Sequence, residues 1–585
     1  MRALRHLNKY FLLYKYRLII GLIITIVARI FATMVPTLVG DSVDVVEQYI
    51  NHEITDISEV KNGLILNILL ILGAVLISAF FTFLMRQTFI VVSRFIEFDL
   101  KNEVFEHYEK LSLNFYKKNR TGDLMNRISE DVSKVRMYVG PAIMYSVNTI
   151  TLFIVVIGYM VSIAPELTLY TVAPLPILSI SIYKLSVAIH KRSTIVQEFL
   201  SKLTTFTQES FSGISVIKAY GIEPQTHQNF SDLSNTSRDK NLDLTKVQAL
   251  FFPLMVLLIG CSNLLVIYIG GNQFIEGKIQ DLGVIVEFII FVNMLTWPVA
   301  TVGWVSSIVQ QAEASQTRIN EFLSQEPEIT NTITTQTPIG GDISFDNVSF
   351  IYDDTNITAL KSISFEVKKG ETIGIIGKTG SGKSTILDLI GRLYDVSEGE
   401  IRIDGVPIKN LNLIDLRKHI GYVPQDAFLF SDSIKNNIKF GDQNASNEEV
   451  YEAAKNAVVH NNIKDFSNGY DTVLGERGIT LSGGQKQRVS IARAIIKKPS
   501  ILLFDDCLSA VDTETEEEIL QNLNAISKDK TTFIVSHRVS TTKNTNKIIV
   551  LKEGEIIQQG THNQLIRTEG YYKELYLKQL NEKET

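Results

Sequence analysis

The chain has 585 residues, of which 45% are hydrophobic and 21% charged, and its mean hydropathy of +0.12 is high for a soluble protein. This length exceeds that of one compact domain and indicates two or three domains. The formal net charge of -6 does not favour a nucleic-acid partner, and the two cysteines, Cys261 and Cys507, argue against a disulfide framework and favour a reducing compartment.

The N-terminal residues are basic and lead into an apolar stretch, as they do in a signal peptide. However, the stretch from Leu18 to Gly40 is too long for the apolar part of such a peptide, and no small-residue cleavage site follows it. We therefore interpret it as a retained membrane span.

Six apolar segments in the first half are long enough to cross a bilayer, for which about 20 residues suffice. They lie at residues 18–40, 63–92, 138–163, 166–188, 247–272 and 282–308. The connections 93–137 and 189–246 are long and rich in Lys and Arg, whereas the connection 41–61 is acidic. Because positive charge stays on the cytoplasmic side, we expect both long connections and both termini to be cytoplasmic. Residues 1–322 are thus predicted to form an all-α transmembrane domain.

The two long connections have apolar residues at helical spacing, which a merely solvated loop would not need. The first is interrupted at Thr121-Gly122-Asp123, a helix-capping sequence, and the second near Phe211-Ser212-Gly213 and again in the segment IKAYGIEP. This pattern predicts helices that continue out of the membrane and meet at short turns, where they can transmit motion.

Charged residues inside the spans are costly in lipid and should face protein or water. Arg29, Arg86 and Glu287 either line a polar translocation pathway or form internal ion pairs and interfacial contacts, and the sequence leaves both open. Pro298 is expected to kink the sixth span.

After a linker at residues 323–340, residues 341–585 are predicted to form a nucleotide-binding domain. The segment ETIGIIGKTGSGKSTILDLIGRL has a strand, a glycine-rich loop and a helix in the order of a P-loop. The loop is Gly377-Lys378-Thr379-Gly380-Ser381-Gly382-Lys383-Ser384, followed by Thr385. Its glycines let backbone N–H groups surround phosphate oxygens, Lys383 reaches the β- and γ-phosphates, and Ser384 ligates Mg²⁺.

Two further motifs extend this prediction. Ile501 to Phe504 form an apolar stretch that predicts a buried strand delivering Asp505 to Mg²⁺, with Asp506 next to it. Leu481-Ser482-Gly483-Gly484-Gln485 precede a helix and form a second phosphate cradle at its N-terminus. One chain needs only one cradle around its own phosphate, so the second indicates a nucleotide bound by two chains.

With these motifs, the chain resembles a half-transporter of the ATP-binding cassette exporter superfamily over nearly its whole length. The resemblance implies a six-helix transmembrane domain with long cytoplasmic extensions, followed by an α/β P-loop ATPase cassette with a helical subdomain. It also implies ATP and Mg²⁺ as ligands, and two cassettes that sandwich ATP between one P-loop and the other chain's signature loop, residues 481–485.

The same resemblance implies roles for residues that carry little signal alone. Tyr352 would stack on adenine, and Gln425 would sense Mg²⁺ and face the coupling helices. His537 would contact the γ-phosphate, Ser509 to Asp512 would bridge the cassettes, and the segment around Glu476 would touch the partner's loops. Taken singly, Tyr352 is better explained as a surface aromatic, Gln425 as a turn residue and His537 as a capping side chain, whereas their order and spacing together favour the functional roles.

Asp506 departs from the family, where this position is usually a Glu that polarises the attacking water. Asp withdraws the carboxylate by about one C–C bond, roughly 1.5 Å, and a misplacement of about 1 Å can cost on the order of a hundredfold in rate. The departure resembles the degenerate-site subunit of heterodimeric multidrug exporters. We expect a heterodimer with a second half-transporter, with a homodimer of two slow sites as the alternative.

The expected function is ATP-driven export of a hydrophobic or amphipathic substrate (a drug, a lipid or a peptide) by alternating access. The expected place is the inner membrane, in contact with membrane lipid. An ATP-gated channel or regulatory subunit is the second hypothesis, although no long regulatory insert separates the two halves. A soluble cassette for repair or translation conflicts with the six predicted spans.

Overall fold

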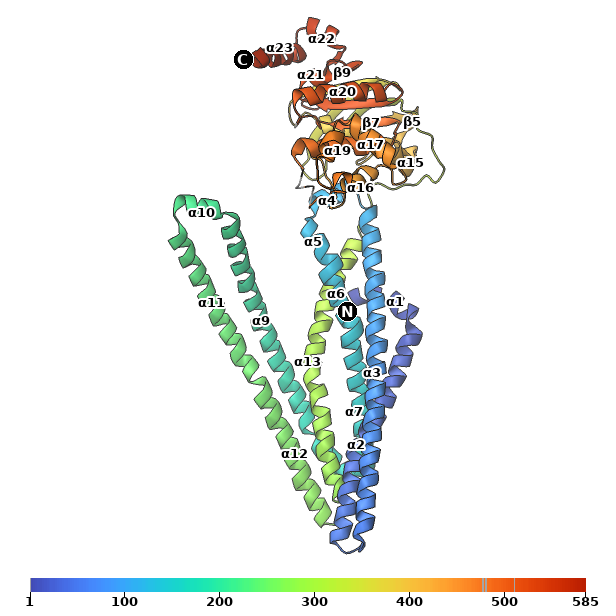
Figure 1. The fold of residues 1–585 in the computed structure, drawn as a ribbon. Coiled ribbons are helices and arrows are strands. Elements are labelled where there is room, and N and C mark those ends of the chain that lie inside the picture. The colour runs from blue at the N-terminus through green and yellow to red at the C-terminus, as the bar shows by residue number, and fades with distance from the viewer. Residues whose placement is uncertain (1, 476–477, 479–480, 510, 585) are drawn as a thin grey trace. The chain divides into compact units, whose positions relative to one another are not determined.

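The structure, a computed structural model, describes residues 2–475, 478, 481–509 and 511–584, and the chain divides into two compact units. The helical unit comprises residues 1–108 and 122–325, and the α/β unit comprises residues 109–121 and 326–585 (Figure 1). The segment 109–121, which lies within the first long connection, therefore packs with the second unit.

Long helices make up the helical unit. In chain order its elements are η1 Ala3–Leu7, α1 Asn8–Leu13, α2 Lys15–Ile50, α3 Ile57–Lys110, α5 Thr121–Asn126, η2 Arg127–Asp131, α6 Val132–Met137, η3 Tyr138–Ala142, α7 Ile143–Ile163, α8 Pro165–Val172, α9 Pro174–Ser212, α10 Ile214–Tyr220, α11 Glu223–Ala249, α12 Phe251–Ile275 and α13 Gly283–Leu323. Its apolar core gathers side chains of α7, α8, α12 and α13, among them Val156, Leu167, Val266 and Phe288.

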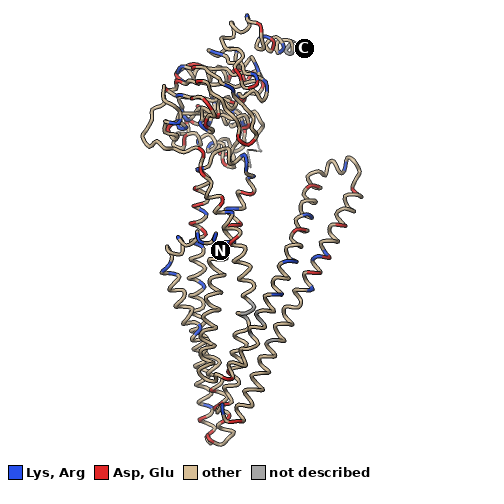
Figure 2. Tube along the Cα trace, turned by 180° about the vertical axis from the view of Figure 1, so that it is seen from behind, with Lys and Arg blue, Asp and Glu red and all other residues tan. Residues whose placement is uncertain are grey.

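Five helical stretches among the described residues are long and apolar enough to cross a membrane. They are Lys15–Ile50, Ile57–Lys110, Thr121–Ile163, Glu223–Ile275 and Gly283–Leu323. These contain four of the six predicted spans in full and, apart from Leu282, a fifth. The other prediction, 166–188, is helical in two pieces, α8 and α9, which meet at Ala173 because Pro174 cannot donate a backbone hydrogen bond. Figure 2 shows few charges along the apolar halves of these helices and many along α9 and α11 near α10.

The helices predicted in the two long connections are confirmed, and their cytoplasmic position stays a prediction. Helix α3 continues without a break from the second predicted span to Lys110. The interruption of the first connection precedes the predicted place, because Thr121 already begins α5 and the turns lie at residues 111–112 and 119–120. In the second connection α9 ends at Ser212, and α10 ends at Tyr220 and is followed by Gly221, whose φ of +63° suits glycine.

The charged residues of the spans differ in their surroundings. Glu287 is buried and packs closely against Gly40, and its Oε2 has no hydrogen-bond partner among the residues that the structure describes. Arg29 is half-buried and Arg86 is exposed. Helix α13 continues through Pro298 to Leu323.

Two sheets organise the α/β unit. The strands are β1 Ile343–Tyr352, β2 Ile357–Val367, β3 Thr372–Gly377, β4 Glu398–Ile403, β5 Val406–Pro407, β6 Ile420–Val423, β7 Ile501–Asp505, β8 Thr531–Ser536, β9 Lys547–Lys552 and β10 Glu555–Gly560. The antiparallel sheet has the order β2-β1-β4-β5, and the larger sheet has the order β10-β9-β3-β8-β7-β6. In the larger sheet β3, β6, β7, β8 and β9 pair in parallel, and β10 is antiparallel to β9.

The helices of this unit pack on the larger sheet and form the helical subdomain, which includes α16, α17 and α19. They are α4 Leu113–Lys118, α14 Lys383–Ile390, η4 Ile408–Asn410, α15 Leu413–Lys418, α16 Ile434–Lys439, α17 Asn447–Asn456, α18 His460–Lys464, η5 Gly469–Asp471, α19 Gly483–Ile496, α20 Thr513–Ile526, α21 Val539–Thr542, α22 His562–Arg567 and α23 Tyr571–Glu584. One core lies between the sheets, and a second joins α16, α17 and α19 to β6 and β7.

Strand order explains where a site can form. Strands β3, β8 and β7 are neighbours, run parallel and are buried throughout. Their carboxyl ends therefore meet at one edge of the sheet, where ligands of open α/β sheets bind. The P-loop follows β3, Asp505 ends β7, and His537 follows β8.

Candidate nucleotide site

The P-loop has the conformation that its glycines predict. Gly380 and Gly382 have φ of +80° and +97°, and a Cβ at Gly377 would lie 2.4 Å from the carbonyl oxygen of Leu551. Lys383 Nζ donates to the carbonyl oxygens of Gly377 and Lys378, both at 2.9 Å, so its buried ammonium lies inside the loop. The loop thus offers close backbone approach and one positive charge, which suit a phosphate.

Ser384 and Asp505 are brought together from residues far apart in the sequence. Ser384 Oγ donates to Asp505 Oδ1 at 2.9 Å, and Asp505 is only 4% exposed. Burial raises the pKa of Asp505, the hydrogen bond from Ser384 opposes this rise, and the neighbouring Asp506 adds to it. Hydroxyl and carboxylate oxygens are the ligands that Mg²⁺ prefers, so this pair fits the predicted metal position.

Asp506 has an unusual backbone conformation. Its φ is +41°, in the left-handed region that Asp tolerates better than most residues, and its N–H donates to the carbonyl oxygen of Val535. Burial raises the pKa of its carboxyl, and His537, Lys383 and Arg538 oppose the rise. This conformation turns the chain sharply after β7 and leaves two carboxylates at one edge of the sheet.

A single cavity of about 310 Å³ unites most of the predicted residues. It is lined by Tyr352, Ile357, Ala359, Thr379, Gly380, Gly382, Lys383, Ser384, Thr385, Gln425, Asp505, Asp506, Val535 and His537. Tyr352 is further tied to the P-loop helix by a 3.0 Å hydrogen bond between its hydroxyl and Thr385 Oγ1. An aromatic ring, a phosphate-binding loop and two acids therefore share one cavity, as binding of a nucleoside triphosphate requires.

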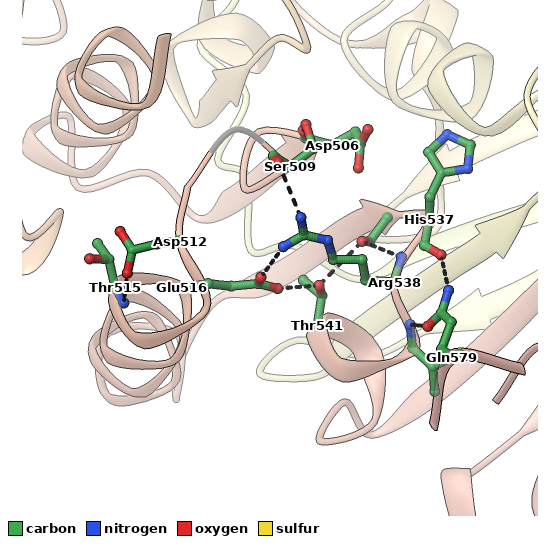
Figure 3. A network of polar contacts seen from close by, with 11 residues as sticks. Asp506, Ser509, Asp512, Thr515, Glu516, His537, Arg538, Thr541 and Gln579 are labelled. Carbon is green, nitrogen blue, oxygen red and sulfur yellow. Dashed lines mark hydrogen bonds and ion pairs between the residues drawn. The ribbon is translucent and has the colours of Figure 1, made fainter. Parts of the chain in front are cut away.

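Side-chain hydrogen bonds connect the segment around His537 to the chain near Ser509 and Glu516 on one side and to Gln579 of α23 on the other (Figure 3). Arg538 donates to the carbonyl oxygen of Ser509 at 3.3 Å and pairs with Glu516, 2.8 Å away and nearly fully buried. Thr541 also donates to Glu516. On the other side of the segment, the amide of Gln579 contacts the backbone at His537 and Val539. His537, the residue predicted to contact the γ-phosphate, therefore lies within a network of hydrogen bonds and one ion pair.

The signature residues and Asp512 do not line this cavity. Ser482 is the N-cap of α19: its hydroxyl accepts from Gln485 N–H, and the Gln485 side chain accepts from Ser482 N–H in return. Asp512 caps α20 by accepting from Thr515 N–H at 3.0 Å. The helix predicted after residues 481–485 is confirmed, whereas the predicted contacts of these residues and of Asp512 with a second chain stay predictions. Glu476 and Ala510 lie outside the described residues.

Several residues of this site were not predicted from the sequence. Gln579, Glu516 and Arg538 support the His537 segment, and Asp388 lies beneath Tyr422, whose hydroxyl donates to it at 3.3 Å. Burial raises the pKa of Asp388 to about 6. Of these residues, only Arg538 could have been found from the sequence, because it directly follows His537. Gln579, Glu516 and Asp388 lack a local motif.

Comparison with known proteins agrees with this geometry. Residues 18–299 match the family described as ABC transporter transmembrane region, and residues 360–509 match the family described as ABC transporter. The probable multidrug resistance ABC transporter ATP-binding/permease protein YheI of Bacillus subtilis (strain 168) is 36% identical, covering 99% of this chain and 97% of the relative. The ATP-dependent lipid A-core flippase of Syntrophus aciditrophicus (strain SB) is also 36% identical, covering 83% and 80%.

A solved structure shows the same arrangement. A bacterial Atm1-family ABC exporter with ATP bound superposes with a TM-score of 0.78 at 27% identity, covering 97% of this chain and 98% of that one. Apolar spanning helices followed by a P-loop ATPase sheet define an ATP-driven membrane transporter. The chain belongs to the ABC transporter family. It is a multi-pass membrane protein whose ATP hydrolysis is coupled to transport.

Proposed function

We propose that this chain is one half of a dimeric exporter that moves a hydrophobic or amphipathic substrate outward by alternating access. The carrying observation is the cavity that unites the P-loop, both aspartates and His537 in a chain that also has long apolar helices. The names of relatives support a drug or a lipid as the substrate, and a peptide shares the required amphipathic chemistry.

The proposed domains are a transmembrane domain at residues 1–322, a linker at 323–340 and a cassette at 341–585. Basic long connections support a cytoplasmic position for both termini and the cassette, in a bacterial inner membrane. Lipid then surrounds the exposed apolar residues of the spanning helices, of which α3 has many, including Ile65, Leu69 and Leu76.

We assign the nucleotide site as follows. The P-loop N–H groups and Lys383 hold the phosphates, Tyr352 stacks on adenine, and Ser384 and Asp505 hold Mg²⁺ with Gln425 close by. When bound, Mg²⁺ neutralises charge on the β- and γ-phosphates. His537 contacts the γ-phosphate. Asp506 orients the attacking water, although its carboxylate lies one C–C bond further from the phosphate than that of a Glu would.

A second chain is supported by two surfaces. Ser482 and its neighbours form a helix N-terminus suited to phosphate but do not line the chain's own cavity. At and beside α10, Phe211, Ile214, Val216 and Tyr220 are between 46% and 78% exposed, and such a patch is typical of an interaction surface. We propose that the partner's cassette covers α10 and that the partner's ATP meets Ser482.

The partner that fits best is a different half-transporter. Asp506 weakens hydrolysis at this chain's own P-loop, whereas its signature residues are complete, so they can complete a competent site on a partner that has Glu. ATP closes the cassettes because it binds the closed dimer more tightly than the open one, and hydrolysis and release reset the transporter.

The test is ATP turnover by the purified full chain in lipid, alone and together with a candidate partner. We expect slow turnover by the chain alone, a rise with the partner, and a rise for Asp506→Glu in the chain alone. Vigorous turnover by the chain alone that Asp506→Asn abolishes would contradict the degenerate site and leave the homodimer.

The channel hypothesis is separated by the direction of flux. In inverted vesicles an exporter accumulates substrate against its gradient when ATP is supplied, and accumulation must stop in Lys383→Met. A channel gives only passive equilibration, so equal concentrations on both sides at the end point would overturn the export proposal.

A further inference from the structure

The C-terminal helix α23 is packed onto the sheet beside the nucleotide site. Tyr572 is fully buried, and it lies in one apolar cluster with Ile376 at the end of β3, Val539 of α21 and Val550 of β9. The Tyr572 hydroxyl also hydrogen-bonds His562 Nδ1 at 2.7 Å. The first turns of α23 are thus anchored to the strand that precedes the P-loop.

Gln579 lies seven residues after Tyr572, two helical turns along α23 and therefore on the same face. Its Nε2 donates to the carbonyl oxygen of His537 at 2.8 Å, and its Oε1 accepts from Val539 N–H, also at 2.8 Å. One side-chain amide therefore holds the backbone on both sides of Arg538. In Figure 3 the imidazole of His537 extends away from Gln579, toward the side of Asp506.

These two bonds satisfy groups that lack local partners. Val539 begins the short helix α21, and the N–H groups of a first helical turn have no partner within the helix. The carbonyl of His537 precedes that helix and accepts from Gln579 across 42 positions of the chain. The bonds fix the direction in which the His537 ring leaves the backbone, while the Arg538 side chain holds Ser509 and Glu516.

We propose that Gln579 is a positioning residue for His537, so that α23 sets the geometry of the ATP site without touching ATP. The inference rests on the proposed contact between His537 and the γ-phosphate. Release of α23 would move His537 and leave nucleotide binding by the P-loop and Tyr352 largely intact.

The test uses the full chain in lipid, with its partner if turnover requires one. Gln579→Met removes both hydrogen bonds at similar side-chain length, and Gln579→Glu keeps the acceptor for Val539 N–H but loses the donor to His537. Gln521→Met is the matched control, because Gln521 is exposed on α20. The measurements are kcat and KM for ATP and amide hydrogen exchange of residues 536–541.

We expect Gln579→Met to lower kcat about tenfold, since a displacement of about 1 Å can cost a hundredfold, with KM changed less than about twofold and faster exchange at residues 536–541. The kcat of Gln579→Glu should fall between those of Gln579→Met and the wild type, and Gln521→Met should match the wild type.

Faster exchange with unchanged kcat in Gln579→Met would overturn the positioning role, and unchanged exchange would overturn the hydrogen bonds themselves. A parallel rise in KM would also overturn it, because the effect would then be a general loss of the site. If the wild type with its partner hydrolyses no ATP, the proposed function fails, whereas the exchange measurement still decides the contact of Gln579.

Discussion

Ser384 Oγ donates to Asp505 Oδ1 at 2.9 Å and thereby joins the first turn of the P-loop helix to the last residue of β7. The bond brings the two oxygen ligands expected for Mg²⁺ to one point, although 121 positions separate them in the chain. Because β8 separates β3 from β7, the pairing requires the strand order of the finished sheet.

The first prediction follows from this pair. Ser384→Ala should weaken the apparent affinity for Mg²⁺ in ATP turnover, raising the half-maximal Mg²⁺ concentration about tenfold, since it removes a ligand and a hydrogen bond to Asp505. A Mg²⁺ titration at fixed ATP measures it, with Ser397→Ala as a control outside the cavity. An unchanged titration curve would contradict the assignment of Ser384.

Lys383 should be essential for turnover. Lys383→Met removes the buried ammonium that lies inside the P-loop and should lower ATP turnover at least about a hundredfold, as does loss of one donor to a developing anion. Lys378→Met, at an exposed lysine of the same loop, is the control and should stay within about threefold. Similar losses in both variants would show that the loop, and not the charge of Lys383, was damaged.

Ser482 should act on the partner's nucleotide. Ser482→Ala should leave nucleotide affinity at this chain's own P-loop within about twofold while lowering turnover of the dimer about a hundredfold, because the hydroxyl serves the other site. Ser446→Ala is the matched control: Ser446 caps α17 with Glu449 in the same reciprocal arrangement. Both variants lose a helix cap worth about 1 kcal/mol, so their effects on stability should be similar. Because only Ser482 is proposed to meet the partner's ATP, only Ser482→Ala should lower turnover.

Glu516 should stabilise the α/β unit. Glu516→Gln breaks a buried ion pair with Arg538 and leaves the guanidinium poorly compensated, which should cost about 2 kcal/mol, less than for a fully buried pair because Arg538 is partly exposed. Thermal unfolding of the full chain measures the loss, and Glu514→Gln on the exposed face of α20 is the control. Equal Tm values for the two variants would refute the stabilising role.

Asp388 should make stability depend on pH. Burial raises its pKa to about 6, whereas the unfolded chain has a value near 3.9. The fold therefore binds an extra proton between about pH 4 and pH 6, and the free energy of unfolding falls as pH rises through this window. Asp388→Asn should be more stable than the wild type at pH 7.5 by about 1–3 kcal/mol, and the difference should vanish near pH 4.

Thermal unfolding across this pH range measures the effect of Asp388. Asp426→Asn, at an exposed aspartate, is the control. A stability difference that is constant with pH would show that Asp388 does not titrate with folding.

The sequence by itself determined those features whose conformation depends only on residues adjacent in the chain, namely the spanning helices, the P-loop and one buried strand. Apolar stretches predicted the spanning helices because lipid demands about 20 apolar residues, and the glycine spacing predicted the P-loop because only glycine adopts φ of +80° to +97° at low cost. The apolar residues 501–504 likewise predicted the buried strand that ends at Asp505.

Only the tertiary structure decided which of these parts meet. Strand order brought Asp505 and His537 beside the P-loop, and packing of Tyr572 brought Gln579 to the His537 backbone. It also grouped residues 109–121 with the second unit, where Ser112 and Asn114 each donate at 2.8 Å to the carboxylate of Glu328. Contacts of this kind have no local signature, because their geometry depends on how distant elements pack and not on the conformation of adjacent residues.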